Sequence, residues 1–176
     1  MLSNIRIAIS GKSGCGNSTV SRLVADKLGL KLINYTFRNM AEDLGISFEE
    51  LRKRAENDDS YDRKLDLKQA ELAEEGNCVL GSRLAIWILD DADLKVYLTA
   101  SDKVRAERVA SREGKTVEAA LKETVERDRL DHGRYLRIYG IDNDDLSKAD
   151  LVIDTEKHNA ETVASIIKDA VESLHR

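Results

Sequence analysis

The chain has 176 residues, which suits one domain with a single sizeable core and is too short for two full domains. Apolar residues make up 41% and charged residues 35%, a balance that excludes disorder through low hydrophobicity, and the longest apolar run, 84–89, is too short to span a membrane. The net charge of −5 argues against a nucleic-acid scaffold, although the 28 lysines and arginines can still gather around a small anion.

Short apolar stretches alternate with helical patterns along the chain. Ile5, Ile7 and Ile9 alternate as in a β-strand, and apolar residues at helical spacing follow over 19–28. Further strands are expected at 30–33, 78–80, 94–98 and 151–153, and further helices at 36–44, 47–56, 59–75, 102–113, 116–137 and 159–174. This rhythm is typical of βαβ units and predicts a three-layer α/β domain with a five-stranded, mainly parallel sheet.

Two details of these helices matter for the site. The helix at 47–56 is expected to open with a capping box between Ser47 and Glu50. The helical stretches 36–75 and 102–137 are longer than crossovers between parallel strands require. We therefore expect them to cover a ligand.

A glycine-rich segment follows the first strand. Residues 11–19 fit the phosphate-binding pattern G-x-x-x-x-G-K-[S/T], except that Asn17 stands where the lysine is expected. The glycines let backbone amides turn toward phosphate oxygens, and the helix that begins near Asn17 adds its positive end. Ser18 has the offset that places a hydroxyl on Mg²⁺. The candidate ATP-binding residues are Gly11, Lys12, Ser13, Gly14, Cys15, Gly16, Asn17, Ser18 and Thr19.

Asn17 removes one cation from the region of the β- and γ-phosphates. Lys12 lies in the same loop and could turn inward to replace it, or arginines elsewhere could supply the charge. For the whole segment, the alternative is a glycine-rich turn between a strand and a helix that binds no ligand. The strand before the loop and the helix after it favour phosphate binding.

Several segments along the chain resemble the compact form of the cytidylate kinase family. They are 11–21, 34–42, 61–69, 81–85, 126–134 and 139–142. The resemblance extends from Ile5 to the C-terminal helix and implies a P-loop NTPase fold of the adenylate-kinase type. It implies a single nucleoside monophosphate kinase domain over 1–176, with a nucleoside monophosphate-binding part at about 35–75 and a lid at about 108–120.

The same resemblance implies an activity. It is the Mg²⁺-dependent transfer of the γ-phosphoryl group of ATP to CMP or dCMP, giving CDP or dCDP and ADP. A cytoplasmic monomer that binds neither nucleic acid nor membranes is expected. The presence of only two cysteines, Cys15 and Cys78, agrees with a reducing compartment.

Arginines carry most of the expected acceptor site. Arg83 follows the third strand, where the family places an arginine on the acceptor phosphate, and a guanidinium offers paired, permanently charged donors. Arg127, Asp131 and Arg134 form the pattern R-x-x-x-D-x-x-R, which resembles the family's acceptor contacts. On a helix these three share one face. The alternatives are a surface salt bridge for Arg83 and a solvated ladder of ion pairs for the helix.

Three further arginines precede Gly114 at helical spacing: Arg105, Arg108 and Arg112. In the enzymes that this chain resembles, arginines here and in the lid close over the donor phosphates. We favour Arg108 and Arg112, together with Arg127, as catalytic residues that stabilise charge on the transferring phosphoryl group. A solvated basic face is the alternative for this cluster.

Weaker matches complete the expected CMP site. Thr36 and Arg38 begin the helices of the nucleoside monophosphate-binding part, where the family contacts base and phosphate. Asp62 and Arg63 lie at the position of a cytosine-reading arginine, with one residue of uncertainty in register. A carboxylate and a guanidinium together would offer both an acceptor and a donor to the cytosine edge.

The chain departs from the family at the end of the third strand. Relatives usually have an Asp or Glu just before the Gly-Arg pair, where it supports the water shell of Mg²⁺. Here Gly81 and Ser82 are neutral. Together with Asn17, this leaves open a catalytically silent nucleotide-binding protein, and a kinase of another small acceptor is the remaining alternative.

Overall fold

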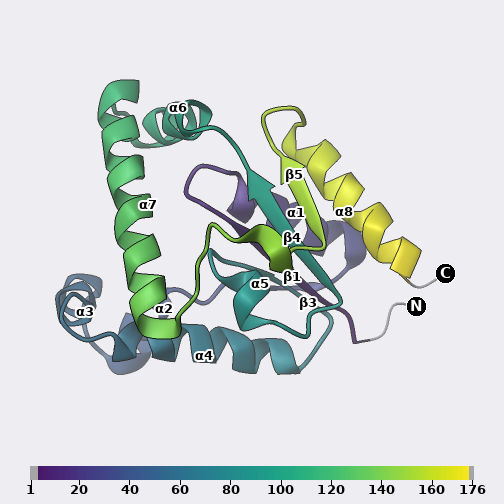
Figure 1. Cartoon of the computed structure of the whole chain (residues 1–176). Coiled ribbons are helices and arrows are strands. Elements are labelled where there is room, and N and C mark those ends of the chain that lie inside the picture. The colour runs from purple at the N-terminus through teal and green to yellow at the C-terminus, as the bar shows by residue number, and fades with distance from the viewer. Residues whose placement is uncertain (1–3, 175–176) are drawn as a thin grey trace.

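The computed structural model describes residues 4–174 of the chain. Five strands form one parallel sheet in the order β2-β3-β1-β4-β5, as Figure 1 shows. The strands are β1 (Arg6–Gly11), β2 (Lys31–Ile33), β3 (Cys78–Gly81), β4 (Leu94–Thr99) and β5 (Leu151–Asp154). The helices are α1 (Asn17–Leu28), α2 (Phe37–Leu44), α3 (Phe48–Ala55), α4 (Ser60–Glu74), α5 (Ala85–Ile88), α6 (Asp102–Glu113), α7 (Val117–Tyr139), a 3₁₀ turn η1 (Leu146–Lys148) and α8 (Ala160–Leu174).

Residues of the central strand point alternately to the two faces of the sheet, and each face has its own core. Ile7 and Ile9 pack with Val24 of α1 and Ile167 of α8. Ala8, between the two isoleucines, belongs to a second core with α5 and Leu80 of β3. Because side chains alternate along a strand, the pattern in β1 builds a three-layer domain.

Two helical units extend beyond the three layers. The first is the pair α6 and α7, which pack through small residues such as Ala106, Ala110 and Ala120. The second is formed by α2 and α3 over Leu51, and α4 follows it in the chain. In Figure 1, α7 runs along one side of the sheet from α6 toward α2, α3 and α4.

The expected elements are confirmed, and the differences lie at their ends. The helix expected to stop at 137 continues to Tyr139 and ends at Gly140, whose φ of 65° is a left-handed turn. The short helix α5 and the turn η1 were not expected. Ser47 accepts the backbone N–H of Glu50, but the Glu50 carboxylate bonds Arg54, so among residues 4–174 the reciprocal capping box occurs at Thr36 and Asn39. Within the same residues, no helix is long and apolar enough to cross a membrane.

Candidate active site

The phosphate-binding loop lies between β1 and α1, at the carboxyl end of the central strand. Gly14 and Gly16 have backbone φ angles of 81° and 87°, which residues other than glycine rarely adopt. A Cβ at Gly14 would also lie 2.8 Å from the backbone oxygen of Arg105. The loop therefore needs glycine at position 14 both for its turn and for the close approach of α6.

The loop and the basic residues around it enclose a cavity of about 360 Å³. Arg83, Arg112 and Arg127 line this cavity together with Lys12 and Ser18. No carboxylate among residues 4–174 lines it. Backbone amides, the start of α1 and these guanidinium groups make it a site for a polyanion.

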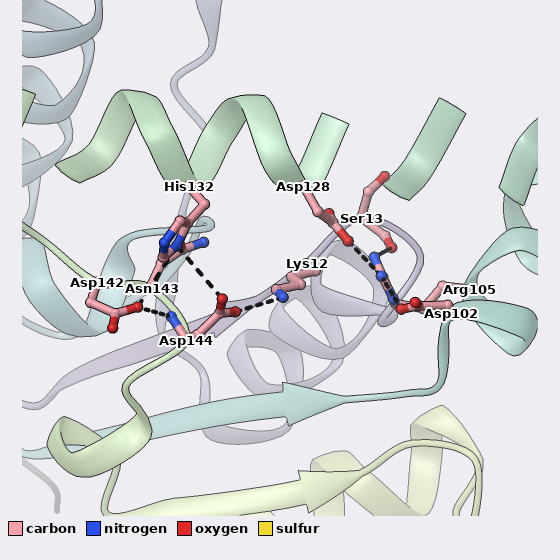
Figure 2. A network of polar contacts seen from close by, with 9 residues as sticks. All are labelled: Lys12, Ser13, Asp102, Arg105, Asp128, His132, Asp142, Asn143 and Asp144. Carbon is pink, nitrogen blue, oxygen red and sulfur yellow. Dashed lines mark hydrogen bonds and ion pairs between the residues drawn. The ribbon is translucent and has the colours of Figure 1, made fainter. Parts of the chain in front are cut away.

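Arg105 contacts the backbone of this loop but does not line the cavity. It is 2% exposed and donates to the backbone oxygen of Ser13 at 3.1 Å. It also pairs with Asp102 at 2.7 Å and Asp128 at 2.5 Å (Figure 2). Burial acts to lower the pKa of Arg105, but its hydrogen bonds to the two carboxylates outweigh burial and raise it. Through these contacts, the charged side chain of Arg105 connects the loop to helices α6 and α7.

Arg108, also on α6, contacts the same loop beside Thr155, the residue that follows β5. Its guanidinium donates to the backbone oxygen of Gly14 at 3.1 Å and to the hydroxyl and backbone oxygens of Thr155, both at 2.9 Å. It lines a separate cavity of about 510 Å³ with Cys15, Thr19 and the segment after β5. The structure therefore separates Arg108 from Arg112, which lines the phosphate-loop cavity.

Asn17 occupies the position of the absent lysine, and its side-chain amide forms hydrogen bonds within the protein. Its amide nitrogen donates to the backbone oxygens of Ile9, at 2.9 Å, and Ser82, at 3.4 Å. Its amide oxygen accepts from the hydroxyl of Ser21 at 2.9 Å. A Cβ at Gly81 would lie 2.8 Å from the Asn17 amide oxygen, so the neutral residue at the end of β3 makes room for this network. Asn17 thereby ties the ends of β1 and β3 together.

Lys12 lines the phosphate-loop cavity while its ammonium group pairs with Asp144 at 2.7 Å (Figure 2). Asp144 lies in the loop after α7, where His132 Nδ1 is 3.6 Å from it and 3.7 Å from Asp142. These three groups lie close enough to share a metal ion. Asp144 already has a cationic partner, however, and nothing further in the structure indicates a metal at this place.

A larger cavity of about 800 Å³ lies between α4 and α7. Its walls combine apolar and aromatic side chains with charged ones, and the charged side chains include both arginines and carboxylates. The lining includes Phe37, Phe48, Arg52, Asp62, Leu65, Asp66, Gln69, Ser82, Arg83, Glu123, Glu126, Arg127, Asp131 and Arg134. Ser82, Arg83 and Arg127 line the phosphate-loop cavity as well, so the two cavities meet at these residues.

The expected R-x-x-x-D-x-x-R face does lie on one side of α7 and faces this larger cavity. Asp131 pairs with Arg83 at 3.0 Å and with Arg134 at 3.1 Å, and Arg134 lies 3.5 Å from Asp62. Arg127 has no ion pair among residues 4–174, and burial together with the positive charge of Arg83 lowers its pKa. Arg127 therefore offers a cation without a carboxylate partner, which suits an anionic ligand.

The register at the start of α4 is decided by packing. Asp62 is buried and lines the larger cavity, whereas the guanidinium of Arg63 donates to the backbone oxygen of Ile138 at 3.4 Å. One turn along the helix, Asp66 accepts a hydrogen bond from the hydroxyl of Tyr139. Burial raises the pKa of Asp66 to about 6.

Thr36 and Arg38 lie at the start of α2, near the cavity but not among the residues that line it. Thr36 caps the helix by accepting the backbone N–H of Arg38 at 3.2 Å. The Arg38 guanidinium lies 4.6 Å from the centre of the Phe48 ring. The aromatic residues Phe37 and Phe48 line the cavity instead.

Sequence reasoning missed several cavity residues. Asp66 and Gln69 line the cavity from α4, four and seven residues after Asp62. The helical spacing from Asp62 was the available signal, because residues at i, i+4 and i+7 share one face of a helix. No comparable signal marked Phe37 and Phe48, which come from two short helices.

The fold and these two adjoining cavities define a class of protein. A parallel sheet with a glycine-rich loop after its central strand, a basic cavity at that loop and a second cavity beside it is the architecture of a P-loop phosphotransferase. Among solved structures, the shikimate kinase from Acinetobacter baumannii in complex with shikimate is similar in fold. Its TM-score is 0.68 at 20% sequence identity, and the match covers 97% of this chain and 94% of that one.

Sequence comparison narrows the class to a family. The model of the cytidylate kinase-like family matches residues 6–157. The cytidylate kinase 2 of Borreliella afzelii is 46% identical over 172 residues, covering 96% of this chain and 97% of that protein. The cytidylate kinase of Pyrococcus horikoshii is 46% identical over 170 residues, covering 96% and 88%. The chain belongs to the cytidylate kinase-like family.

Proposed function

We propose that this chain transfers the γ-phosphoryl group of ATP to CMP or dCMP and releases ADP with CDP or dCDP. The observation that carries the proposal is the meeting of the two cavities at Arg83 and Arg127. A donor phosphate in the loop and an acceptor phosphate in the larger cavity would approach each other at these two guanidinium groups. The positive charge of these guanidinium groups then lies beside the negative charge of the transferring phosphoryl group.

The donor nucleotide binds along residues 11–19, with its phosphates on the backbone amides and the start of α1. Arg112 and Arg127 line the phosphate-loop cavity and stabilise the charge that spreads over the transferring group. Arg108 acts from the neighbouring cavity, where it already fixes the backbone oxygen of Gly14. Residues 108–120 serve as the lid over the phosphates.

The acceptor binds in the larger cavity with its phosphate on Arg83 and Arg127. Asp131 and Arg134 orient these cations and the nucleoside, and Asp62 faces the base or sugar. Thr36 and Arg38 support the aromatic wall of Phe37 and Phe48 within the nucleoside monophosphate-binding part, residues 35–75. Aromatic surface beside placed polar and charged groups suits a small ligand that has both a ring and a phosphate.

The site fits a magnesium ion that arrives with ATP. Ser18 is the residue that would hold it, and the lack of a carboxylate in the cavity leaves its other ligands to phosphate oxygens and water. When bound, the ion neutralises phosphate charge. The buried hydroxyl of Ser82, which has no partner within residues 4–174, lies where the two cavities meet and suits a phosphate oxygen.

The protein acts on free nucleotides as a monomer in the cytoplasm, without nucleic acid or membrane partners. Both cysteines, Cys15 and Cys78, are buried and free, which agrees with a reducing compartment. The proposal is tested by coupling ADP release to CMP, dCMP, UMP and AMP in turn. Turnover with CMP or dCMP supports it, and ADP release that no acceptor stimulates contradicts it.

A further inference from the structure

A buried amide oxygen in the acceptor cavity has no partner. Gln69 lies on α4, lines the cavity and is 6% exposed. Its Nε2 donates to the backbone oxygen of Tyr35 at 2.9 Å, whereas Oε1 accepts no hydrogen bond from any residue in 4–174. An unpaired buried amide oxygen costs free energy, so a donor from a ligand is the expected partner.

The orientation of this amide is set by the protein. The backbone oxygen of Tyr35 is an acceptor only, so it selects the NH₂ side of Gln69 and leaves Oε1 on the other side. A flipped amide would place two oxygens against each other. Gln69 therefore offers an acceptor, and not a donor, to whatever occupies the cavity.

The acceptor's base is the part of the ligand that reaches α4. Its phosphate binds at Arg83 and Arg127, which also line the phosphate-loop cavity, whereas no residue of α4 lines that cavity. Leu65 of α4, together with Phe37 and Phe48, supplies apolar surface for the faces of a ring. A nucleotide with its phosphate on the arginines thus directs its base toward the α4 wall.

The other side-chain oxygens on the α4 wall belong to carboxylates, and each of these carboxylates has one polar neighbour. Asp62 faces the guanidinium of Arg134 at 3.5 Å, and Asp66 accepts from the hydroxyl of Tyr139. Oε1 of Gln69 is the neutral acceptor on this wall, and it has no hydrogen bond within residues 4–174. Cytosine has an exocyclic amine that donates, and uracil has a carbonyl oxygen at the same ring position.

We infer that Oε1 of Gln69 accepts a hydrogen bond from the 4-amino group of the acceptor's cytosine ring and thereby selects cytosine over uracil. This inference rests on the proposed function and adds a specificity-determining residue to it. The carbonyl of uracil would face Oε1 with a second acceptor. A site built to bind a substrate N–H rejects an analogue without that group because its own buried acceptor is left unpaired.

The first test compares CMP with the 5′-monophosphate of 2-pyrimidinone riboside, which lacks only the 4-amino group. The natural protein should prefer CMP by about 5- to 150-fold in kcat/KM. Gln69→Met keeps the length of the side chain without the acceptor, so this preference should fall to within about twofold. Leu72→Met, a change on α4 that does not touch the cavity, should keep the full preference.

A purely structural role for Gln69 predicts a different result. Losing the bond to Tyr35 would lower turnover of CMP and of the analogue by the same factor and leave their ratio unchanged. That result would overturn the inference. A natural protein that neither binds nor phosphorylates CMP would overturn the proposed function itself, and this inference with it.

The second test needs no variant, so it holds even where Gln69→Met does not fold. Gln69 is the only glutamine in the sequence, so selective ¹³C and ¹⁵N labelling of glutamine gives a single side-chain amide in NMR spectra. CMP should move the carbonyl carbon resonance of Gln69 downfield, as expected for a new hydrogen bond to Oε1. The 2-pyrimidinone nucleotide should not. The same displacement with both nucleotides would overturn the inference.

Discussion

The ammonium group of Lys12 lies 2.7 Å from Oδ1 of Asp144, and this contact joins the phosphate-binding loop to the segment after α7. The two side chains are 32% and 56% exposed, so the pair is accessible to solvent. Ion pairs of this kind are worth at most about 1 kcal/mol. An incoming triphosphate is a stronger partner than one exposed carboxylate, so Lys12 is able to exchange Asp144 for the donor phosphates.

This exchange leads to a prediction about the missing loop lysine. If Lys12 replaces it, Lys12→Ala should lower kcat markedly in the natural protein and much less in an Asn17→Lys background. A double-mutant cycle on kcat measures this non-additivity. Asn17→Lys also removes the bonds of Asn17 to Ile9 and Ser21, so the stability of that variant has to be measured first. Strict additivity, or a harmless Lys12→Ala, would assign the charge to Arg112 and Arg127.

Ser18 is expected to act through the metal. Ser18→Ala should impair turnover more than it impairs nucleotide binding, because the loop amides still hold the phosphates. Comparing kcat over a Mg²⁺ titration with the Kd for ATP separates the two effects. Thr19, the neighbouring hydroxyl, provides a control as Thr19→Val. Mg²⁺-dependent turnover that Ser18→Ala leaves untouched would contradict the assignment.

Arg83 is expected to hold the acceptor phosphate. Arg83→Ala removes a charged hydrogen-bonding partner, which costs roughly 1.5–3 kcal/mol, or about 10- to 150-fold in CMP affinity. Calorimetric titration should show this loss for CMP and little change for ATP. The variant also leaves Asp131 with Arg134 as its remaining partner, so thermal unfolding is recorded alongside. An equal loss for both nucleotides would indicate a folding defect.

The raised pKa of Asp66 makes the free energy of unfolding depend on pH. Its pKa is about 6 in the folded protein against an ordinary value of 3.8, chiefly because it is buried. The folded state therefore keeps a proton that the unfolded chain releases, and the stability from this group is full below about pH 4 and is lost as the pH rises through about 6.

Asp66→Asn removes this dependence and keeps an oxygen for Tyr139. Urea unfolding at intervals between pH 4 and 7 should show the natural protein losing about 2–3 kcal/mol relative to the variant as pH rises. Tyr139→Phe is the matched control, because the Tyr139 hydroxyl lowers the pKa of Asp66 and its removal should move the transition to higher pH. Parallel stability profiles would mean that Asp66 titrates normally.

Local features of the sequence were enough to predict the order of strands and helices along the chain. The alternation in Ile5, Ile7 and Ile9 has the period of a strand, and the spacing in α1 has that of a helix, whatever the rest of the chain does. The phosphate-binding loop could be predicted as well, because its residues are contiguous and Gly14 and Gly16 stand where the loop needs positive φ angles. The family was readable for the same reason, since its motifs are short segments in a fixed order.

Contacts between distant segments were decided by the tertiary structure. Arg105, Arg108 and Arg112 have the same helical spacing, but packing places the first on Ser13, the second on Gly14 and Thr155, and the third in the phosphate-loop cavity. Lys12 pairs with Asp144, which is far away in the sequence, and no local sequence pattern relates the two positions.

The acceptor cavity depends most on tertiary structure. Only the packing of α4 against α7 turns Asp62 into the cavity and Arg63 out of it, because adjacent residues of a helix point about 100° apart. The free oxygen of Gln69 exists because Tyr35, more than thirty residues earlier, bonds the other end of its amide. Sequence alone determines which chemical groups the chain carries, whereas burial and distant partners decide which of them remain available to a ligand.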